Sequence, residues 1–432
     1  MISSPHPEIR GWTGALALDS IQHLMKKLFS TLLTLTVALV CHRVESADVQ
    51  AIHYQAGVSS AVITPGRPMP MSGYGGRKAP AQGKDQDLFG KALAIKDASG
   101  NRVVFITLDL IGVTAELRSA VESRVAKRFD LPAHALVMNA SHTHCGPAYM
   151  RPELKDYFEE IVDKLVGAVG DALKQLQPAQ LSYAHAKCGF AMNRRTPSST
   201  GYKNHPNPNG PVDHTVPVLR VEDAQGKLFA VMFGYACHNT SVGYLRWLGD
   251  YAGYAQEYFE QDHPGVTAMF LMGCGGDQNP YPRGTAEWAQ KHGRSLATAV
   301  EAALEVTQRT LRHQYQLEGP IKTVLQTVDL EFTNDREDFA YPVQVIQFGK
   351  RLSIITLGNE VTIDYSLRLK RELGKDDGPT IWVAGYSNVY SGYIPSKRVL
   401  LEGGYEAKSR PWKPELEERI ITQVKELFGQ VN

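Results

Sequence analysis

The chain has 432 residues, and 46 Lys and Arg residues against 45 Asp and Glu residues give it a formal net charge of +1. This balance argues against a nucleic-acid-binding protein that relies on a broad basic face. With 43% hydrophobic and 21% charged residues, the composition is that of a folded protein and not of a disordered or collagen-like one. Five Cys residues are too few for a disulfide scaffold.

The N-terminal segment differs from the rest of the chain. A basic start at residues 25–27 is followed by an uncharged apolar run at 28–40 and a small-residue end at 44–47. This order predicts a secretory signal peptide, because the run is shorter than the ~20 apolar residues that a spanning helix needs. We therefore expect residues 1–47 to be an N-terminal extension plus signal peptide, with translation starting at Met25. Export to a periplasm or to the outside follows from this prediction.

Strands and helices are predicted to alternate through the rest of the chain. Alternating or β-branched apolar residues predict strands at 58–63, 92–96, 103–108 and 135–140. Helical periodicity predicts helices at 115–129, 152–176, 251–262, 286–304, 361–373 and 414–428. This order favours an α/β fold with mixed α+β layers, and we expect residues 48–432 to form a single large domain. Residues 195–213, dense in Pro, Asn, Gly and Ser, are expected to form a functional loop at a site rim.

Three histidines stand at predicted strand ends. His142 and His144 follow the strand at 135–140, and alternate residues of an extended segment point to the same face. Neutral imidazoles are common zinc ligands, so this pair suggests half of a metal site, although surface histidines give the same pattern. His238 follows a second apolar run at 228–237, and α/β folds place their chemistry at such strand ends. A core His that is hydrogen-bonded to the backbone is the alternative interpretation.

Acidic and phenolic side chains follow further along the chain. Glu360 lies between a third apolar strand and a helix, where it is either a favourable acid of the first helical turn or an oxygen ligand or general base. Asp250 opens a helix and is interpreted first as its N-cap. A Tyr-rich segment then contains Tyr386, Tyr390, Tyr393 and Tyr405. Spacing alone does not distinguish these tyrosines from half-buried packing residues.

Together these segments resemble the neutral/alkaline, non-lysosomal ceramidase family, which comprises zinc-dependent amidases that hydrolyse the N-acyl bond of ceramide. The family's H-T-H-S-G-P is matched by residues 142–147, with Cys145 in place of the Ser. Its later His and its zinc Glu are matched by His238 and Glu360. Its tail, N-x-Y-x-x-Y followed by Y-E, is matched within residues 388–406. The resemblance implies a fold built around one zinc hydrolase site.

The resemblance also implies roles for individual residues. One zinc ion per chain would be held by His142, His238, Glu360 and Tyr393. The catalytic residues would be His144, which handles a proton, Tyr405, which donates to the oxyanion, Arg194, Asp277 and Gln278. Zinc-activated water would attack the amide, and no protein nucleophile is needed.

Two departures from the family pattern matter. The family's G-D-V-S-P-N is shortened here to residues 275–280, which contain no Ser. Family members commonly continue into an immunoglobulin-like C-terminal domain, whereas this chain is expected to end after one helix without that domain. The substrate is predicted to be ceramide or a related N-acyl lipid, cleaved to fatty acid and amine.

Several alternatives stay open at this point. Two other functions are compatible with the sequence. The protein could be an exported zinc hydrolase of a non-ceramide amide or ester, or a non-catalytic relative that binds lipid or carbohydrate. Cys145 is either a packing residue or a nucleophile served by His144 or His142. Asn139 and Asn239 begin formal glycosylation motifs, but each adjoins a proposed ligand, so both are predicted to line the site. The sequence does not determine the pairing of the cysteines, the oligomeric state or a peripheral membrane contact, and no nucleic-acid partner is expected.

Overall fold

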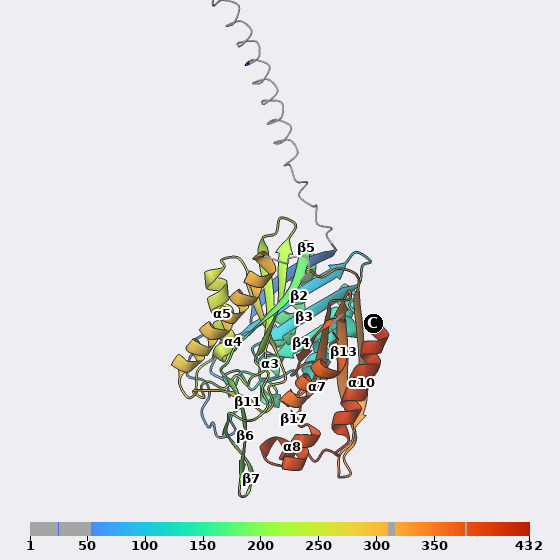
Figure 1. Ribbon diagram of the computed structural model, residues 1–432. Helices are drawn as coiled ribbons and strands as arrows, with labels where there is room; N and C mark the ends of the chain where they lie inside the picture. The colour runs from blue at the N-terminus through green and yellow to red at the C-terminus, as the bar shows by residue number, and fades with distance from the viewer. Residues whose placement is uncertain (1–24, 26–52, 310–315, 376–377) are drawn as a thin grey trace, which may run out of the picture. The chain divides into compact units, whose positions relative to one another are not determined.

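The computed structural model describes residue 25 and residues 53–309, 316–375 and 378–432 (Figure 1). The predicted extension and signal peptide, residues 1–47, lie outside the described residues apart from Met25. Within the described part of the chain, no helix is long and apolar enough to cross a membrane.

The largest sheet has eight strands in the order β10-β9-β8-β5-β1-β2-β3-β4. Their bounds are β1 Tyr54–Val62, β2 Phe89–Asp97, β3 Arg102–Leu108, β4 Leu136–Ala140, β5 Gln177–Lys187, β8 Thr215–Asp223, β9 Leu228–Tyr235 and β10 Thr267–Met272. Two neighbouring pairs, β3 with β4 and β9 with β10, are parallel, and the other pairs are antiparallel.

A second sheet has the order β12-β13-β14-β16 and one parallel pair, β14 with β16. Its strands are β12 Ile321–Leu330, β13 Phe339–Phe348, β14 Leu352–Leu357 and β16 Thr380–Ala384. The two sheets share a core in which Leu93 and Phe105 of the first cluster with Ile346 and Ile354 of the second. Because each sheet buries one face against the other, the strands are apolar on that face.

Helices cover the remaining faces. They are α2 Ala115–Phe129, α3 Lys155–Lys174, α4 Asp250–Asp262, α5 Ala286–Arg309, α7 Ile363–Leu373 and α10 Leu416–Val431. Helices α2 and α3 pack on the first sheet in one cluster, and α4 and α5 pack on it in another. Helices α7 and α10 cover the second sheet, and α10 runs beside β13 (Figure 1). The predicted mixed α/β layers are therefore confirmed.

Local sequence explains where these helices begin and end. In α2 the Thr114 hydroxyl caps the helix by accepting a hydrogen bond from the Leu117 amide at 3.2 Å. Leu117, Val121 and Val125 recur every four residues and are fully buried. Asp130 then turns into the left-handed conformation and ends the helix. The predicted range 115–129 matches α2 because all three signals are local.

Residues 195–213 were expected to form a loop, and this expectation was wrong for the first part of the segment. A hairpin of β6 Ala191–Ser198 and β7 Gly201–Asn207 occupies it, and β6 also pairs with β11 Gln278–Pro280. The small β11-β6-β7 sheet tolerates Pro197 and Pro206 because β7 is an edge strand and the hairpin tip is exposed. The high content of Pro, Asn and Ser therefore led to the prediction of a loop where the chain forms a hairpin.

In the two larger sheets each parallel strand pair is joined by a helix, which gives three strand–helix–strand units: β3-α2-β4, β9-α4-β10 and β14-α7-β16. Such units place functional residues at the carboxyl ends of their strands. The two edge strands of the large sheet, β4 and β10, meet at Asn139. The side-chain Oδ1 of Asn139 accepts a hydrogen bond from the Met272 backbone N–H at 2.7 Å. Its Nδ2 donates to Gly385 O at 2.7 Å and to Ser387 Oγ at 3.0 Å.

We predict that Asn139→Ala destabilises the fold, because the Met272 amide would be buried without a partner and the Gly385 carbonyl would keep only the Ser387 hydroxyl as a donor. At 1–3 kcal/mol for an unsatisfied buried group, the free energy of unfolding should fall by about 2 kcal/mol. Urea denaturation measures this change. The exposed loop residue Asn209 supplies the control, since Asn209→Ala should change stability by less than ~0.5 kcal/mol. Equal losses in both variants would contradict the proposed importance of this junction.

Candidate active site

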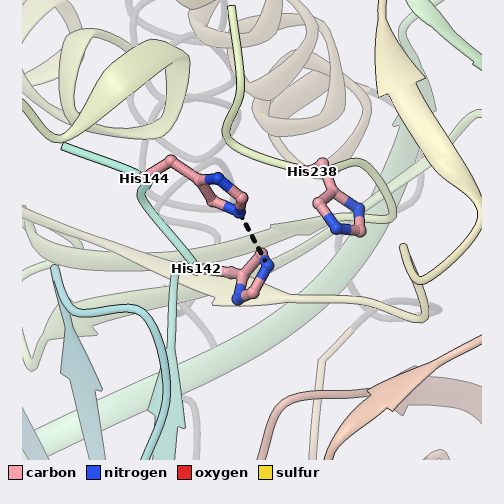
Figure 2. A group of neighbouring side chains, drawn as sticks. All are labelled: His142, His144 and His238. Atoms are coloured by element: carbon pink, nitrogen blue, oxygen red, sulfur yellow. Dashed lines mark hydrogen bonds between the residues drawn. The ribbon is translucent and has the colours of Figure 1, made fainter. Parts of the chain in front are cut away.

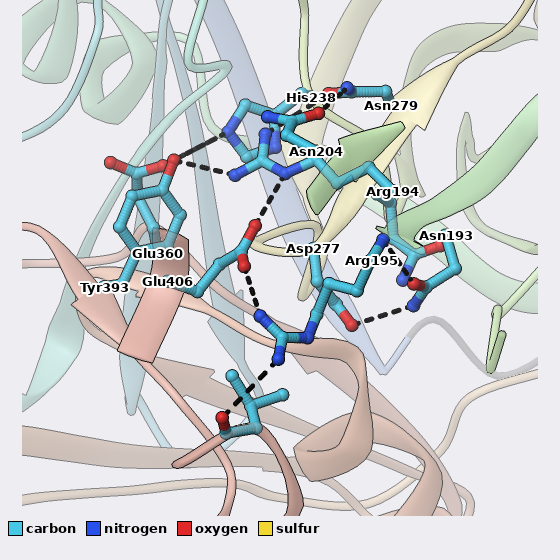
Figure 3. Close-up of polar contacts among 12 residues, drawn as sticks. Asn193, Arg194, Arg195, Asn204, His238, Asp277, Asn279, Glu360, Tyr393 and Glu406 are labelled. Atoms are coloured by element: carbon cyan, nitrogen blue, oxygen red, sulfur yellow. Dashed lines mark hydrogen bonds and ion pairs between the residues drawn. The ribbon is translucent and has the colours of Figure 1, made fainter. Parts of the chain in front are cut away.

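The four side chains predicted as metal ligands come together from the three strand–helix–strand units. His142 follows β4, His238 follows β9, and Glu360 begins the two-residue strand β15 Glu360–Val361 just after β14. Strand β15 pairs in parallel with β17 Tyr393–Ile394, and this register sets Glu360 directly opposite Tyr393. Figures 2 and 3 show the result: residues distant in sequence face one centre.

The donor atoms of these side chains are close together. The Glu360 Oε2 atom lies 3.1 Å from His238 Nε2 and 3.3 Å from His142 Nε2. The Tyr393 hydroxyl lies 3.4 Å from His238 Nε2. A ligand nitrogen from each of His142, His144 and His238 can be chosen so that all lie within 4.8 Å of one another (Figure 2). The structure therefore brings together all four predicted ligands, with His144 beside them.

Backbone contacts determine which ring nitrogens face the centre. His142 Nδ1 lies 2.6 Å from the Ile111 carbonyl, and His238 Nδ1 lies 2.7 Å from the Gly275 carbonyl. A carbonyl only accepts, so we assign the proton to each Nδ1, which leaves an Nε2 lone pair directed at Glu360. Lone pairs of two imidazoles and a carboxylate at this spacing form a donor set that a cation between them would satisfy. A tetrahedral ion with bonds of about 2.0 Å separates its ligands by about 3.3 Å, so this N and O donor set fits zinc.

The ionisation states also suit a divalent cation. Burial, with a contribution from the charge of Arg194, lowers the pKa of His238 to about 4. Burial and the neighbouring His142 and His238 rings hold the pKa of His144 well below its usual value. Burial by itself raises the pKa of Glu360, but His142 and His238 outweigh it and hold that pKa well below its usual range. At neutral pH His144 and His238 are thus neutral and Glu360 is a carboxylate.

Two further predicted residues lie at the edge of this centre. Arg194 on β6 is buried, and its Nη2 donates to the Tyr393 hydroxyl at 2.9 Å (Figure 3). Tyr405 begins the short helix α9 Tyr405–Lys408, and its ring centroid lies 5.4 Å from that of Tyr393. Tyr405 is 60% exposed, so it stands where a substrate entering from solvent would meet it.

Asp277 and Gln278, which were predicted as catalytic residues, make their side-chain hydrogen bonds outside the histidine cluster. The Asp277 carboxylate accepts from the Ile363 amide and the Asn193 side chain, each at 2.9 Å. The Gln278 side chain donates to Pro211 O at 3.1 Å, while its backbone carbonyl accepts from the His238 amide at 3.1 Å. Through these contacts Asp277 holds the start of α7, and Gln278 holds the segment that carries His238.

The structure contradicts the alternative in which Cys145 is the nucleophile. Its Sγ atom lies 3.7 Å from Arg77 Nη2 and 3.9 Å from the Val242 carbonyl, in a buried position. Burial and the charge of Asp250 raise the pKa of this thiol to about 12, so a thiolate does not form near neutral pH. Cys145 is a packing residue. Within the described residues all four cysteines, at 145, 188, 237 and 274, are unpaired and buried.

Asp250 is not the N-cap that was predicted. The N-cap of α4 is Gly249, and Asp250 is the first helical residue, with a φ of 56°. Its carboxylate accepts from the Tyr251 amide at 2.7 Å and also from the Ser241 and Val242 amides at 3.2 and 3.3 Å. These bonds tie the segment after His238 to the helix. The prediction recognised the helix start but not this second attachment.

Four residues around the centre were not assigned roles from the sequence. The Tyr390 hydroxyl donates to Glu360 Oε1 at 3.2 Å, and the Tyr386 ring lies 4.7 Å from that of His142. The Tyr74 ring lies 4.7 Å from that of His144, and Glu406 holds Arg194 at 2.8 Å. Tyr386, Tyr390 and Glu406 belong to the Tyr-rich tail, and this motif was the sequence feature that could have indicated a role for them in the site. Tyr74 lies in another segment, and only tertiary contacts bring it here.

Asn139 and Asn239, the formal glycosylation acceptors, are both fully buried. The Asn239 side chain donates to the Ser141 carbonyl and accepts from the Ala252 amide. A glycan has no room at either position in the folded protein. Their predicted place in the walls of the site agrees with this burial.

Comparisons with known proteins identify the family of this chain. The family model described as neutral/alkaline non-lysosomal ceramidase, N-terminal, matches residues 54–273, just over half of the chain. Neutral ceramidase A of Dictyostelium discoideum is 28% identical over 261 residues, which is 54% of this chain and 36% of that protein. Neutral ceramidase of Mycobacterium tuberculosis is 25% identical over 240 residues, 49% of this chain and 37% of that protein. The matched region thus spans little more than a third of these curated relatives.

A solved structure shows the same fold. The crystal structure of neutral ceramidase from Pseudomonas aeruginosa matches with a TM-score of 0.75 at 18% sequence identity, covering 88% of this chain and 74% of that chain. At this identity the match establishes the fold and not the chemistry of the site.

We predict that His238→Ala and Glu360→Gln each weaken zinc binding by more than ~100-fold, because loss of a direct ligand should cost more than loss of a supporting contact. Metal analysis after dialysis against buffered zinc measures the affinity. His134 is exposed, and the one hydrogen bond described for its side chain is with Thr323, so His134→Ala should keep one zinc per chain. Undiminished zinc in His238→Ala would show that the ligand assignment is wrong.

Proposed function

Because this chain belongs to the neutral/alkaline non-lysosomal ceramidase family, we propose that it is a zinc-dependent hydrolase of the N-acyl bond of ceramide or a closely related N-acyl lipid. The products would be a fatty acid and an amine. The observation that carries the proposal is the convergence of His142, His238, Glu360 and Tyr393 on one buried centre. The names of the relatives supply ceramide as the first substrate to test.

His142, His238, Glu360 and Tyr393 would hold one zinc ion. A zinc ion in such a site acts as a Lewis acid and lowers the pKa of water to about 7. The surrounding protein keeps the donors in place: the Ile111 and Gly275 carbonyls orient the two imidazoles, and the Tyr390 hydroxyl holds the second oxygen of Glu360.

The remaining residues supply the proton transfer and the charge stabilisation. His144 is neutral, with its Nε2 3.1 Å from that of His142, so it can take a proton from the attacking water and pass it to the leaving amine. The Tyr405 ring lies beside that of Tyr393, and its hydroxyl would donate to the oxygen that becomes negative as the amide carbonyl is attacked. Arg194 adds a buried positive charge next to Tyr393. No step requires a protein nucleophile, which agrees with the inert thiol of Cys145.

A second candidate is hydrolysis of a different amide or ester by the same centre. It is favoured by residues 278–280, where Gln and Asn replace the Ser of the family motif and form strand β11. The Asn279 side chain accepts from Arg194 Nη1 at 3.2 Å, so this replacement lies near the proposed oxyanion groups. A change here alters substrate contacts without altering the zinc ligands.

The direct test is release of fatty acid from ceramide in detergent micelles by zinc-loaded protein, with a panel of N-acyl amides and esters beside it. Chelation should abolish release, and His142→Ala should lower kcat/KM by at least ~10³-fold. Cys145→Ser, which restores the family's residue, should stay within about threefold of the wild type, as should protein treated with iodoacetamide. Activity that survives chelation but is lost on alkylation would refute the proposal. Binding without turnover on the whole panel would favour a non-catalytic relative.

A glycine tests the role of His144. Gly73 has a φ of +94°, and a Cβ atom there would lie 2.4 Å from His144 Cγ, so Gly73→Ala must displace the imidazole. We expect kcat to fall by about 100-fold, the order of loss that a displacement of about 1 Å produces, with zinc content unchanged. Gly100→Ala is the matched control, because Gly100 also has a positive φ, of +92°, and no atom lies within 4 Å of its added Cβ. Full activity in Gly73→Ala, measured by fatty acid release, would exclude His144 from the reaction.

A further inference from the structure

Glu406 is a buried carboxylate shared by two consecutive arginines. It is 2% exposed, and its Oε1 accepts from Arg194 Nε at 2.8 Å while its Oε2 accepts from Arg195 Nη1 at 2.5 Å (Figure 3). Neighbouring residues on a regular strand point to opposite faces. Here a register shift between Asn193 and Arg195 in the β6-β7 pairing interrupts that alternation, and both guanidinium groups reach the same carboxylate.

This arrangement is electrostatically demanding. Arg194 and Arg195 are 3% and 2% exposed, and two adjacent buried cations repel each other. A buried charge is tolerated only when it is paired and hydrogen-bonded. Glu406 pairs with both Arg194 and Arg195, whereas Glu402 and the Gly403 carbonyl hold Arg195 alone. Among the described contacts, Glu406 is therefore the carboxylate that restrains both guanidinium groups.

Arg194 connects Glu406 to the site. Its Nη2 donates to the Tyr393 hydroxyl at 2.9 Å and its Nη1 to Asn279 Oδ1 at 3.2 Å, while Nε is held by Glu406. A planar guanidinium has a fixed fork of donors, so anchoring Nε fixes the direction of the other two. The orientation of the Tyr393 hydroxyl therefore depends on a carboxylate that does not touch the zinc ligands itself.

Glu406 also holds the segment that carries Tyr405. Gly403 and Gly404, with φ of 71° and 87°, form the turn before α9, and helix α8 Lys397–Glu402 precedes them. Tyr405 follows this turn and is largely exposed, so its own packing restrains it little. The adjacent Glu406 is the buried attachment of this short helix.

We propose that Glu406 is a positioning residue that aligns both tyrosines of the site: Tyr393 through Arg194, and Tyr405 through the attachment of α9. This inference rests on the proposed function, because it assumes that Tyr393 and Tyr405 serve a metal centre and an oxyanion. Glu406 does not act on the substrate itself.

The chain contains a natural control in Glu402. Its carboxylate accepts from Arg195 Nη2 at 3.1 Å and from Arg398 Nη1 at 2.9 Å, and no contact with Arg194 is found among the described interactions. Glu402 therefore has the same chemistry and shares one arginine with Glu406, but it lacks the connection to Tyr393.

The experiment compares Glu406→Gln with Glu402→Gln in the full chain, loaded with Co²⁺ in place of zinc and separately with zinc. We expect Glu406→Gln to change the visible absorption bands of bound Co²⁺, because the Tyr393 oxygen shifts, and to lower kcat for N-acyl lipid hydrolysis by about 100-fold with KM within threefold. Glu402→Gln should leave the Co²⁺ spectrum unchanged and kcat within threefold. Arg194→Lys should reproduce the Glu406→Gln effects, and the double variant should be no worse than either single one.

Melting temperatures separate positioning from folding. If Glu406→Gln does not fold, Glu406→Asp keeps the charge with a shorter reach and should still shift the Co²⁺ bands. Equal effects of the Glu402 and Glu406 variants, or an unchanged spectrum and kcat in Glu406→Gln or Glu406→Asp, would overturn the inference. If the wild type binds Co²⁺ but hydrolyses no N-acyl lipid, the proposed function fails, while the spectrum still decides whether Glu406 positions Tyr393.

Discussion

The whole site depends on the junction made by the Asn139 side chain. This one amide joins β4 and β10, the two edge strands of the large sheet, and the turn after β16 of the second sheet. A buried amide must find partners for its donor and acceptor, and here those partners belong to the end of β10 and to the turn after β16. His142 lies three residues after Asn139, so the same junction that closes the fold also brings the first imidazole to its place.

Close to that junction the protein buries polar and charged side chains, and each of them would be unfavourable if it were buried without the others. Imidazole lone pairs, a carboxylate and a phenol face one another in a buried centre, and a buried Arg–Glu–Arg cluster stands beside it. Each group is oriented by a second contact, such as the Gly275 carbonyl at His238. Such outer contacts fix the direction of a donor atom before any ion or substrate arrives. The surrounding sheets provide the rigid frame that this requires.

The family resemblance is unequal across the site. Residues placed as metal donors are all present and converge, whereas the segment at 275–280 lacks the Ser of the family motif and Cys145 replaces another Ser. Cys145 is buried and lies against Arg77, so this exchange is a matter of packing. Gln278 and Asn279 are different, because their segment supports His238 and touches Arg194. The proposed metal donors therefore match the family pattern that the sequence suggested, whereas residues 275–280 depart from it.

The sequence by itself determined the alternation of strands and helices, the helix bounds of α2, and the candidate ligands, because caps, periodicity and short motifs act over a few residues. It was wrong about the hairpin at 191–207, whose pairing with β11 is a long-range contact that local composition does not encode. Only the tertiary structure decided that Tyr390, Tyr74 and Glu406 lie around the centre, and that the Cys145 thiol is inert. The reason is physical: burial, shared hydrogen bonds and the opposition of Glu360 to Tyr393 exist only once distant strand ends have been brought together.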